Sequence, residues 1–397
     1  MQSSDNKIRQ QEAGEPETGN KSFRNGLPDT IRRLVIKVGS RVLVDDKGQP
    51  DPKQIAGLTD QIAGLHRKGY EVVFVSSGAI AAGVQALGWS HRPVSLPDLQ
   101  MSAAVGQGVL LSCYSDHLAR HGCKLGQVLL THADLNDRVR HLNARNTIMA
   151  MLRNRVIPVV NENDVVAVDE IRFGDNDLLA AMVATLVDAD LLVLLTTSDG
   201  LFRTEGGRLT ERIPQLDDIT DETLEMAQGK GSNWSSGGMA SKLQSADRAN
   251  RAGTPVIIAN GHQENILERL LGGEDLGTLV SGPASRQKLK ARKKWIAFFH
   301  RPQGSIYVDD GACRAIVKKG HSLLPVGIRR AEGKFRAGSL VNIRNTEGKT
   351  IARGLTAYDR DDIERIMGKR SVDVPFVLGD RHHVEVIHRD NMVILTT

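Results

Sequence analysis

Short apolar runs alternate with stretches of helical spacing through the first two thirds of the chain. The runs are "RLVIKVG", "EVVFVSS", "GQVLLT", "VIPVVN", "LLVLLTT" and "PVIIAN". Apolar residues recur at helical spacing in the stretches between them, including 97–121, 139–154 and 177–188. Strands that are apolar on both faces and separated by helices are typical of a mainly parallel sheet covered on both sides. This pattern predicts a three-layer α/β domain over residues 29–282.

The last third of the chain has a different pattern. A basic stretch, "SRQKLKARKKW", predicts a linker that leads into a first strand over residues 283–300. Beyond it, segments such as "GSIYVDD", "SLVNIRN" and "KTIARGLTAY" read as short strands with polar turns and few helical patterns. A small β-barrel over residues 301–393 would close so many short strands. Residues 1–28 are polar and lack periodicity, which predicts a disordered tail.

Composition and charge narrow the class of protein. With 397 residues, of which 40% are hydrophobic, the chain can fill the cores of two domains. Its formal net charge of +5 suits anionic ligands but is small for a nucleic-acid-binding protein. Three cysteines without a C-x-x-C pair indicate neither a disulfide framework nor a zinc site, so we expect a cytoplasmic protein. No apolar run approaches the roughly 20 residues of a membrane span, and the first residues lack the apolar stretch of a secretory signal, so we expect neither feature.

Two common phosphate-binding motifs do not fit. "TEGKTIARG" contains G-K-T, but the Walker loop needs a glycine where this chain has Ile343. "VGQGVLL" lies inside a helical pattern and breaks the dinucleotide fingerprint at Leu111. Neither a P-loop nor a dinucleotide-binding enzyme is therefore indicated.

A different glycine-rich segment precedes a helix. "GSNWSSGGMASK", residues 231–242, is followed by apolar residues at helical spacing from Met239 onward. Backbone N–H groups at a helix N-terminus attract anions, and glycine lets the backbone approach a phosphate closely. The alternative is a flexible surface loop capped by a serine.

Polar residues also follow three of the predicted strands. Lys37, on the first strand, needs an anionic partner or an exit to water. Ser77 precedes a helix in "FVSSGAIAAG", where it could hold a carboxylate or serve as an ordinary helix cap. Amides and carboxylates crowd "VVNENDVVAVDEIRFGDND", where they could orient a ligand, a metal or a lysine, or only form turns and caps. They are Asn161, Asn163, Asp164, Asp175, Asn176 and Asp177.

The candidate residues share one chemical character. The strand-end loops are rich in anion donors, Lys37 and Lys242 can meet there, and no serine–histidine–acid order or metal-ligand spacing stands out. Phosphoryl transfer needs such a site, because positioning and charge neutralisation dominate that reaction.

In these segments the chain resembles the amino acid kinase superfamily, and within it the branch that phosphorylates the side-chain carboxylate of L-glutamate at the start of proline biosynthesis. The resemblance runs from about residue 31 to 393. Its carriers are "VIKVGS", "SSGAIAAG", "AAVGQG", "LLTHADLNDR", "LNARNT", "PVVNENDVVA", "GDNDLLAA", "SSGGMASKLQSA" and "VDDGACRAIVKKGHSLLPVGI". Related acetylglutamate and uridylate kinases place a glycine-rich turn where this chain has "SSGA" and lack the second domain.

The resemblance implies roles for individual residues. Lys37 and Lys242 would be catalytic, with Asp175 orienting both lysines. Glutamate would be held by Ser77, Gly78, Asn163, Asp164 and Asn176. ATP would contact Lys37, Gly39, Thr196, Thr197, Ser236, Gly237, Gly238, Met239, Ala240, Ser241 and Lys242. The family usually has Thr-Asp at Thr196-Thr197 and Thr-Lys at Ser241-Lys242, so this chain departs from the pattern at the nucleotide contact of Thr197, whereas Ser241 keeps a hydroxyl.

The resemblance also implies a C-terminal PUA domain, Mg²⁺ held mainly through the ATP phosphates, feedback inhibition by proline and a homo-oligomer. No residue is expected to ligate a metal directly. Two alternatives stay open: a kinase of the same superfamily acting on another carboxylate or carbamate, and an RNA-binding protein acting through the PUA-like domain.

Overall fold

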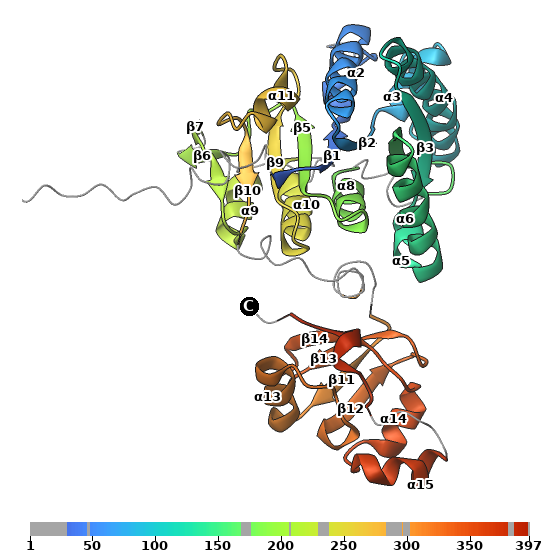
Figure 1. Ribbon diagram of the computed structural model, residues 1–397, viewed down its shortest axis with the longest axis vertical. Coiled ribbons are helices and arrows are strands. Elements are labelled where there is room, and N and C mark those ends of the chain that lie inside the picture. Colours follow the sequence, from blue (N-terminus) through green and yellow to red (C-terminus); the bar gives the residue numbers. More distant parts are fainter. Residues whose placement is uncertain are drawn as a thin grey trace, which may run out of the picture.

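The computed structural model of the chain describes residues 30–45, 48–167, 176–205, 208–228, 238–282, 296, 302–379 and 385–395. These residues form a larger α/β unit followed by a smaller unit rich in β-strands (Figure 1). The predicted disordered tail, and the predicted linker apart from Ile296, lie outside the described residues.

An eight-stranded sheet forms the centre of the larger unit. In spatial order its strands are β3 (Lys124–Leu130), β4 (Val156–Glu162), β2 (Glu71–Val75), β1 (Arg33–Val38), β5 (Leu191–Thr196), β9 (Val256–Asn260), β10 (Thr278–Val280) and β8 (Gln215–Leu216). The first six pair in parallel, and β10 runs antiparallel to β9. These six are the six strands that the apolar runs predict, so the mainly parallel sheet is confirmed.

Helices cover both faces of the sheet, as Figure 1 shows. One apolar cluster contains residues of α2 (Pro52–Arg67), α3 (Ala79–Ala86), α4 (Leu96–Arg120) and α11 (Ile266–Leu271). The other contains residues of α5 (His132–Asn136), α6 (Arg138–Arg153), α8 (Asn176–Leu186) and α10 (Met239–Arg251), and partly buried residues of α9 (Asp221–Gln228) pack against it. A hairpin of β6 (Phe202–Glu205) and β7 (Arg208–Arg212) lies outside the main sheet.

Strand β1 shows why the sheet is buried on both sides. Leu34 and Ile36 belong to one apolar cluster and Val35 to the other, and all three are at most 1% exposed. Burying each aliphatic side chain of this kind stabilises the folded state by about 1.5–3 kcal/mol. Because both faces are covered, Lys37 can reach solvent or a ligand only at the carboxyl end of the strand.

The smaller unit is a five-stranded sheet packed against helices. Its strands, in spatial order, are β12 (Ile328–Gly333), β11 (Gly304–Val308), β13 (Leu340–Arg344), β14 (Thr350–Leu355) and β15 (Met392–Ile394). An isolated bridge between Leu323 and Ile387 adds to these pairings, and together they give the β-rich second domain that the sequence predicts.

The expectation of few helices in this unit was wrong. It contains α13 (Asp310–Lys319), α14 (Arg360–Ile366) and α15 (Val374–Leu378). Helix α13 has recognisable ends, because the Asp309 side chain accepts a hydrogen bond from the Ala312 N–H at 2.8 Å and Gly320 adopts φ 63°.

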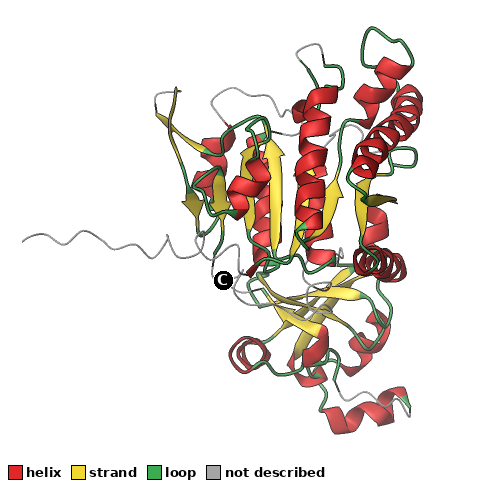
Figure 2. Cartoon of the chain, turned by 45° about the horizontal axis from the view of Figure 1, so that its top comes forward, coloured by secondary structure: helices red, strands yellow, loops and turns green. Residues whose placement is uncertain are grey.

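The two units touch through apolar side chains. Leu340, Leu355 and Val393 of the smaller unit belong to the same buried cluster as the helices on one face of the larger sheet. Figure 2 shows the smaller unit directly below the larger one. The second unit therefore covers the face on which α8 and α10 lie.

Candidate active site

Two lysines that lie far apart in the sequence contact one buried carboxylate. Lys37 Nζ, on β1, is 2.5 Å from Asp177 Oδ1, and Lys242 Nζ, on α10, is 2.9 Å from Asp177 Oδ2. The three residues are 4%, 6% and 0% exposed, in the order Lys37, Lys242, Asp177. We call these three side chains the lysine centre.

The electrostatics of the lysine centre favour an anion. Asp177 lies in the first turn of α8, where the helix dipole stabilises a carboxylate. It carries one negative charge, and the two lysines carry two positive charges. The lysine centre therefore has a formal charge of +1 in a site shielded from water, where charge interactions are stronger than at the surface.

A cavity of about 320 Å³ opens onto the lysine centre, and we call it the lysine cavity. Its lining includes Lys37, Gly39, Ser40, Arg41, Val42, Ser77, Thr196, Thr197, Ser198, Gly200, Leu201, Phe202, Leu209, Met226, Ala227, Gly238, Met239 and Lys242. No aspartate or glutamate is among these described residues. Lysines, hydroxyls and backbone N–H groups suit a polyphosphate.

Two glycines shape the wall of the lysine cavity. Gly238 precedes α10 without a side-chain cap bond, so the N–H groups of the first turn can meet an anion. Gly39 donates its N–H to the Leu195 carbonyl at 3.0 Å, and a Cβ at Gly39 would lie 3.2 Å from that same oxygen. A side chain at Gly39 would therefore crowd the space next to Lys37.

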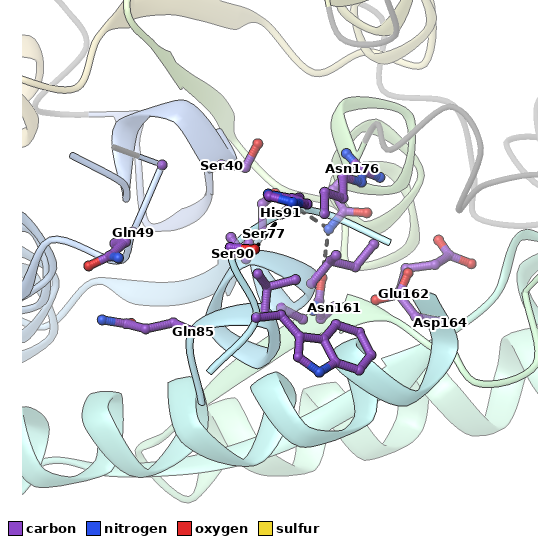
Figure 3. Close-up of a pocket in the computed structure, with 18 residues that line it drawn as sticks. Ser40, Gln49, Ser77, Gln85, Ser90, His91, Asn161, Glu162, Asp164 and Asn176 are labelled. Atoms are coloured by element: carbon purple, nitrogen blue, oxygen red, sulfur yellow. Dashed lines mark hydrogen bonds between the residues drawn. The ribbon is translucent and has the colours of Figure 1, made fainter. Parts of the chain in front are cut away.

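A second cavity, of about 370 Å³, lies beside the first, and we call it the amide cavity (Figure 3). Its lining includes Ser40, Gly48, Gln49, Ser77, Gly78, Ala79, Ile80, Ala81, Val84, Gln85, Trp89, Ser90, His91, Arg92, Asn161, Glu162, Asp164 and Asn176. Ser40 and Ser77 line both cavities, so the two spaces adjoin at these hydroxyls.

Hydrogen bonds order the amides on one side of the amide cavity. Asn176 Nδ2 donates to the Ser76 carbonyl at 2.7 Å and to Asn161 Oδ1 at 2.6 Å. Asn161 Nδ2 in turn donates to Gln107 Oε1 at 2.6 Å. Four separate segments, the end of β2, α4, β4 and the start of α8, are thereby held together at the carboxyl ends of β2 and β4.

Gly78 turns the chain between β2 and α3. It is the N-cap of α3 with φ +91°, a conformation that a side chain would strain, and it makes no side-chain cap bond. Ser77 is therefore not an ordinary helix cap. Its side chain, only 8% exposed as a residue, lies at the junction of the two cavities.

Helices α3 and α4 cross closely behind the amide cavity. A Cβ at Gly83 would lie 1.7 Å from the Ser102 carbonyl oxygen, and one at Gly106 would lie 1.8 Å from the Ala79 carbonyl oxygen. Only glycine permits this approach. The contact fixes the start of α3, which carries the Ser77–Gly78 turn, against the turn of α4 that carries Gln107.

The structure gathers most of the predicted residues at these cavities. The lysine cavity is lined by the predicted residues Lys37, Gly39, Thr196, Thr197, Gly238, Met239 and Lys242. The amide cavity is lined by Ser77, Gly78, Asp164 and Asn176. Ala240 and Ser241 lie in the first turn of α10, and Asp175, Ser236 and Gly237 lie outside the described residues.

Two predicted assignments differ from what the structure places at the cavities. The carboxylate that contacts both lysines is Asp177, although the resemblance gave this role to Asp175. Asn163 does not line the amide cavity, and its backbone N–H donates to the Leu130 carbonyl at 3.0 Å. Strand β4 instead presents Asn161 and Glu162 there, which are 2% and 5% exposed.

The described residues contain no group of three or more His, Cys, Asp or Glu side chains that could bind a metal ion. Burial raises the pKa of Tyr114, which exchanges a hydrogen bond of 2.9 Å with Ser76 Oγ behind the amide cavity. No described helix combines the length and the apolar character that a membrane span requires.

The arrangement suits group transfer between two bound molecules. One cavity offers cations and N–H groups, the other offers amides, hydroxyls and carboxylates, and the lysine centre lies beside their junction. Positioning and charge neutralisation are what such a site supplies.

Sequence comparisons agree with this chemistry. The chain matches the profile of the Amino acid kinase family over residues 32–260 and that of the PUA domain over residues 304–378. A protein named "Glutamate 5-kinase" from Trichlorobacter lovleyi is 46% identical over 376 residues, which cover 94% of this chain and 100% of that protein. Another of that name, from Chromohalobacter salexigens, is 46% identical over 365 residues, covering 92% and 96%. A third, from Moorella thermoacetica, is 44% identical over 366 residues, covering 92% and 96%.

Proposed function

Because the chain belongs to the amino acid kinase family, we propose that it transfers the γ-phosphoryl group of ATP to the side-chain carboxylate of L-glutamate, forming L-glutamyl 5-phosphate for proline biosynthesis. The observation that carries this proposal is the junction of the two cavities beside the buried Lys37–Asp177–Lys242 centre. The full-length similarity to proteins named "Glutamate 5-kinase" supports the choice of acceptor.

ATP would occupy the lysine cavity and glutamate the amide cavity. The phosphates would meet the N-terminus of α10 and the ammonium groups of Lys37 and Lys242. The donor set fits Mg²⁺ carried on the phosphates, because the described lining of the lysine cavity has hydroxyls and lysines but no carboxylate. Bound Mg²⁺ would neutralise part of the phosphate charge.

The reaction needs no general base from the protein. A side-chain carboxylate with an ordinary pKa near 4.3 is already ionised at neutral pH, so it can attack phosphorus directly. The obstacle is repulsion, since two like charges about 4 Å apart repel by about 4 kcal/mol at an effective dielectric constant of 20. Lys37 and Lys242 offset this repulsion, and Asp177 holds their ammonium groups at the junction.

Proline is the expected inhibitor, and it would compete with glutamate. Proline carries the α-amino and α-carboxylate groups of glutamate, so the amide cavity can accept it without a remote site. Inhibition curves measured at several glutamate concentrations test this competition, and inhibition that ignores glutamate concentration would refute it. The homo-oligomer expected from the family is open to sedimentation measurements.

A coupled assay of ADP release tests the proposed function. Purified protein with MgATP should release ADP rapidly with L-glutamate and slowly with N-acetylglutamate, aspartate or carbamate. The Lys242→Met variant serves as the matched inactive control. Faster turnover of any other acceptor would refute the assignment of glutamate.

A further inference from the structure

Three side-chain amides, those of Asn176, Asn161 and Gln107, form a chain of hydrogen bonds beside the amide cavity, which we call the amide chain. A backbone carbonyl fixes which atom donates and which accepts at each step. The Ser76 carbonyl can only accept, so the Asn176 atom 2.7 Å from it must be Nδ2. The Asn161 atom 2.6 Å from that nitrogen must then be Oδ1, which turns Asn161 Nδ2 towards Gln107. Gln107 therefore presents Oε1, and the direction of all three side-chain amides follows from one carbonyl.

This direction decides what Asn176 can offer a ligand. Both hydrogens of its Nδ2 are directed to protein acceptors, through short bonds to the Ser76 carbonyl and Asn161 Oδ1 and a longer contact of 3.5 Å to Ser77 Oγ. The group left for a ligand is the acceptor Oδ1. Glu162 and Asp164 also line the amide cavity, and ionised carboxylates only accept hydrogen bonds. This side of the cavity is therefore built to receive donors.

We infer that Gln107 is a positioning residue of the amino-acid site: through Asn161 it holds Asn176 so that the cavity presents acceptors to the α-ammonium group of the substrate. The inference rests on the proposed function, because it takes the amide cavity as the site for glutamate. Gln107 acts without touching the substrate, since it is not among the residues that line the cavity.

The packing of α4 holds Gln107 rigidly at one end of the amide chain. The neighbouring Gly106 lies against the α3 backbone so closely that a Cβ there would be 1.8 Å from the Ala79 carbonyl oxygen. The helix cannot shift to follow a displaced Asn161. Without the acceptor at residue 107, Asn161 can rotate about its side-chain bonds, and Asn176 loses one of its two fixed acceptors.

The test compares Gln107→Met, Gln107→Glu and Gln100→Met. The methionine side chain at residue 107 removes the acceptor, whereas a glutamate side chain there keeps an oxygen facing Asn161 Nδ2. Gln100 is the matched control, because it is another half-buried glutamine of α4 and donates to the Ala167 carbonyl away from the amide chain. The readouts are kcat and KM for glutamate, and inhibition constants for glutarate, which lacks the α-ammonium group, and for 4-aminobutyrate, which lacks the α-carboxylate.

Gln107→Met should raise the glutamate KM and the inhibition constant of 4-aminobutyrate about five- to ten-fold, as loss of one hydrogen bond predicts. It should change kcat and the inhibition constant of glutarate less than two-fold. Gln107→Glu and Gln100→Met should match the parental enzyme.

Equal weakening of glutarate and 4-aminobutyrate by Gln107→Met, or no difference between Gln107→Met and Gln100→Met, would overturn the inference. A parental protein without glutamate-dependent ADP release would refute the proposed function itself. The two failures are therefore distinguishable.

Discussion

Replacing Asp177 by asparagine should destabilise the larger unit severely while keeping its shape. Asn has nearly the same size as Asp but carries no charge. The change leaves two ammonium groups, at 4% and 6% residue exposure, without the carboxylate that lies 2.5 and 2.9 Å from them. Breaking a buried ion pair by removing one partner costs about 3–5 kcal/mol.

Thermal unfolding measures this cost. For a domain of roughly 150–250 residues, each kcal/mol shifts Tm by about 2–4 °C, so Asp177→Asn should lower Tm by about 6–20 °C. The matched control is Asp188→Asn. Asp188 pairs with Arg145 at 3.1 Å, but both side chains are about 30% exposed, so its loss should cost less than about 1 kcal/mol.

A second variant identifies the cause. Adding Lys242→Met to Asp177→Asn removes one of the two buried positive charges and should restore part of the lost Tm. A shift below about 2 °C for Asp177→Asn, or a double variant less stable than either single one, would refute charge compensation at the lysine centre.

The remaining predictions concern packing, catalysis and pH. Gly106→Ala should lower the free energy of unfolding by about 1–3 kcal/mol, because its Cβ would overlap a carbonyl of α3. Gly108→Ala, on the open side of α4, should raise it by up to about 1 kcal/mol. The midpoints of urea unfolding distinguish the two variants. Lys242→Met should lower kcat about 10²- to 10³-fold in the ADP assay, and a parental rate would contradict its role. Asn176→Ala should raise the KM for glutamate far more than the KM for ATP, and the reverse would place the substrates wrongly. Burial lowers the pKa of His141 below its usual 6.5, so the stability due to its neutral form is present above that pH and is lost on acidification; His141→Gln should flatten the fall of the urea midpoint below pH 6.5.

The regular elements near the site could be predicted from the sequence. The six buried strands and the helices at 97–121, 139–154 and 177–188 agree with the structure to within a residue or two at most ends. Buried parallel strands form continuous apolar runs, and the helices between them keep a 3.6-residue period. Lys37 and Lys242 could be predicted as site residues for the same reason, since each lies at an end of a regular element that meets the site.

The sequence could not predict which side chains at the ends of strands and helices point into the site. Asp177 contacts the lysines from the first turn of α8, and the sequence alone does not show where that turn begins or how α8 packs. Asn161 and Asn163 similarly lie on one face of an extended chain, and only the end of β4 at Glu162 decides which one lines the cavity. The order of the strands in the second unit depends on pairing between distant segments, for which local patterns carry no signal.

The fate of an oxygen atom tests the central claim most directly. If the side-chain carboxylate attacks the γ-phosphorus of ATP at the lysine centre, the product carries a carboxylate oxygen bridging carbon and phosphorus. The α-amine of that product then closes on the acyl carbon, forming 5-oxoproline and expelling phosphate with the bridging oxygen. L-Glutamate labelled with ¹⁸O in its side-chain carboxylate should therefore yield inorganic phosphate carrying one ¹⁸O atom, detected by ³¹P NMR. Glutamate-dependent ADP release that yields only unlabelled phosphate would contradict the account, because water and not the carboxylate would then be the acceptor.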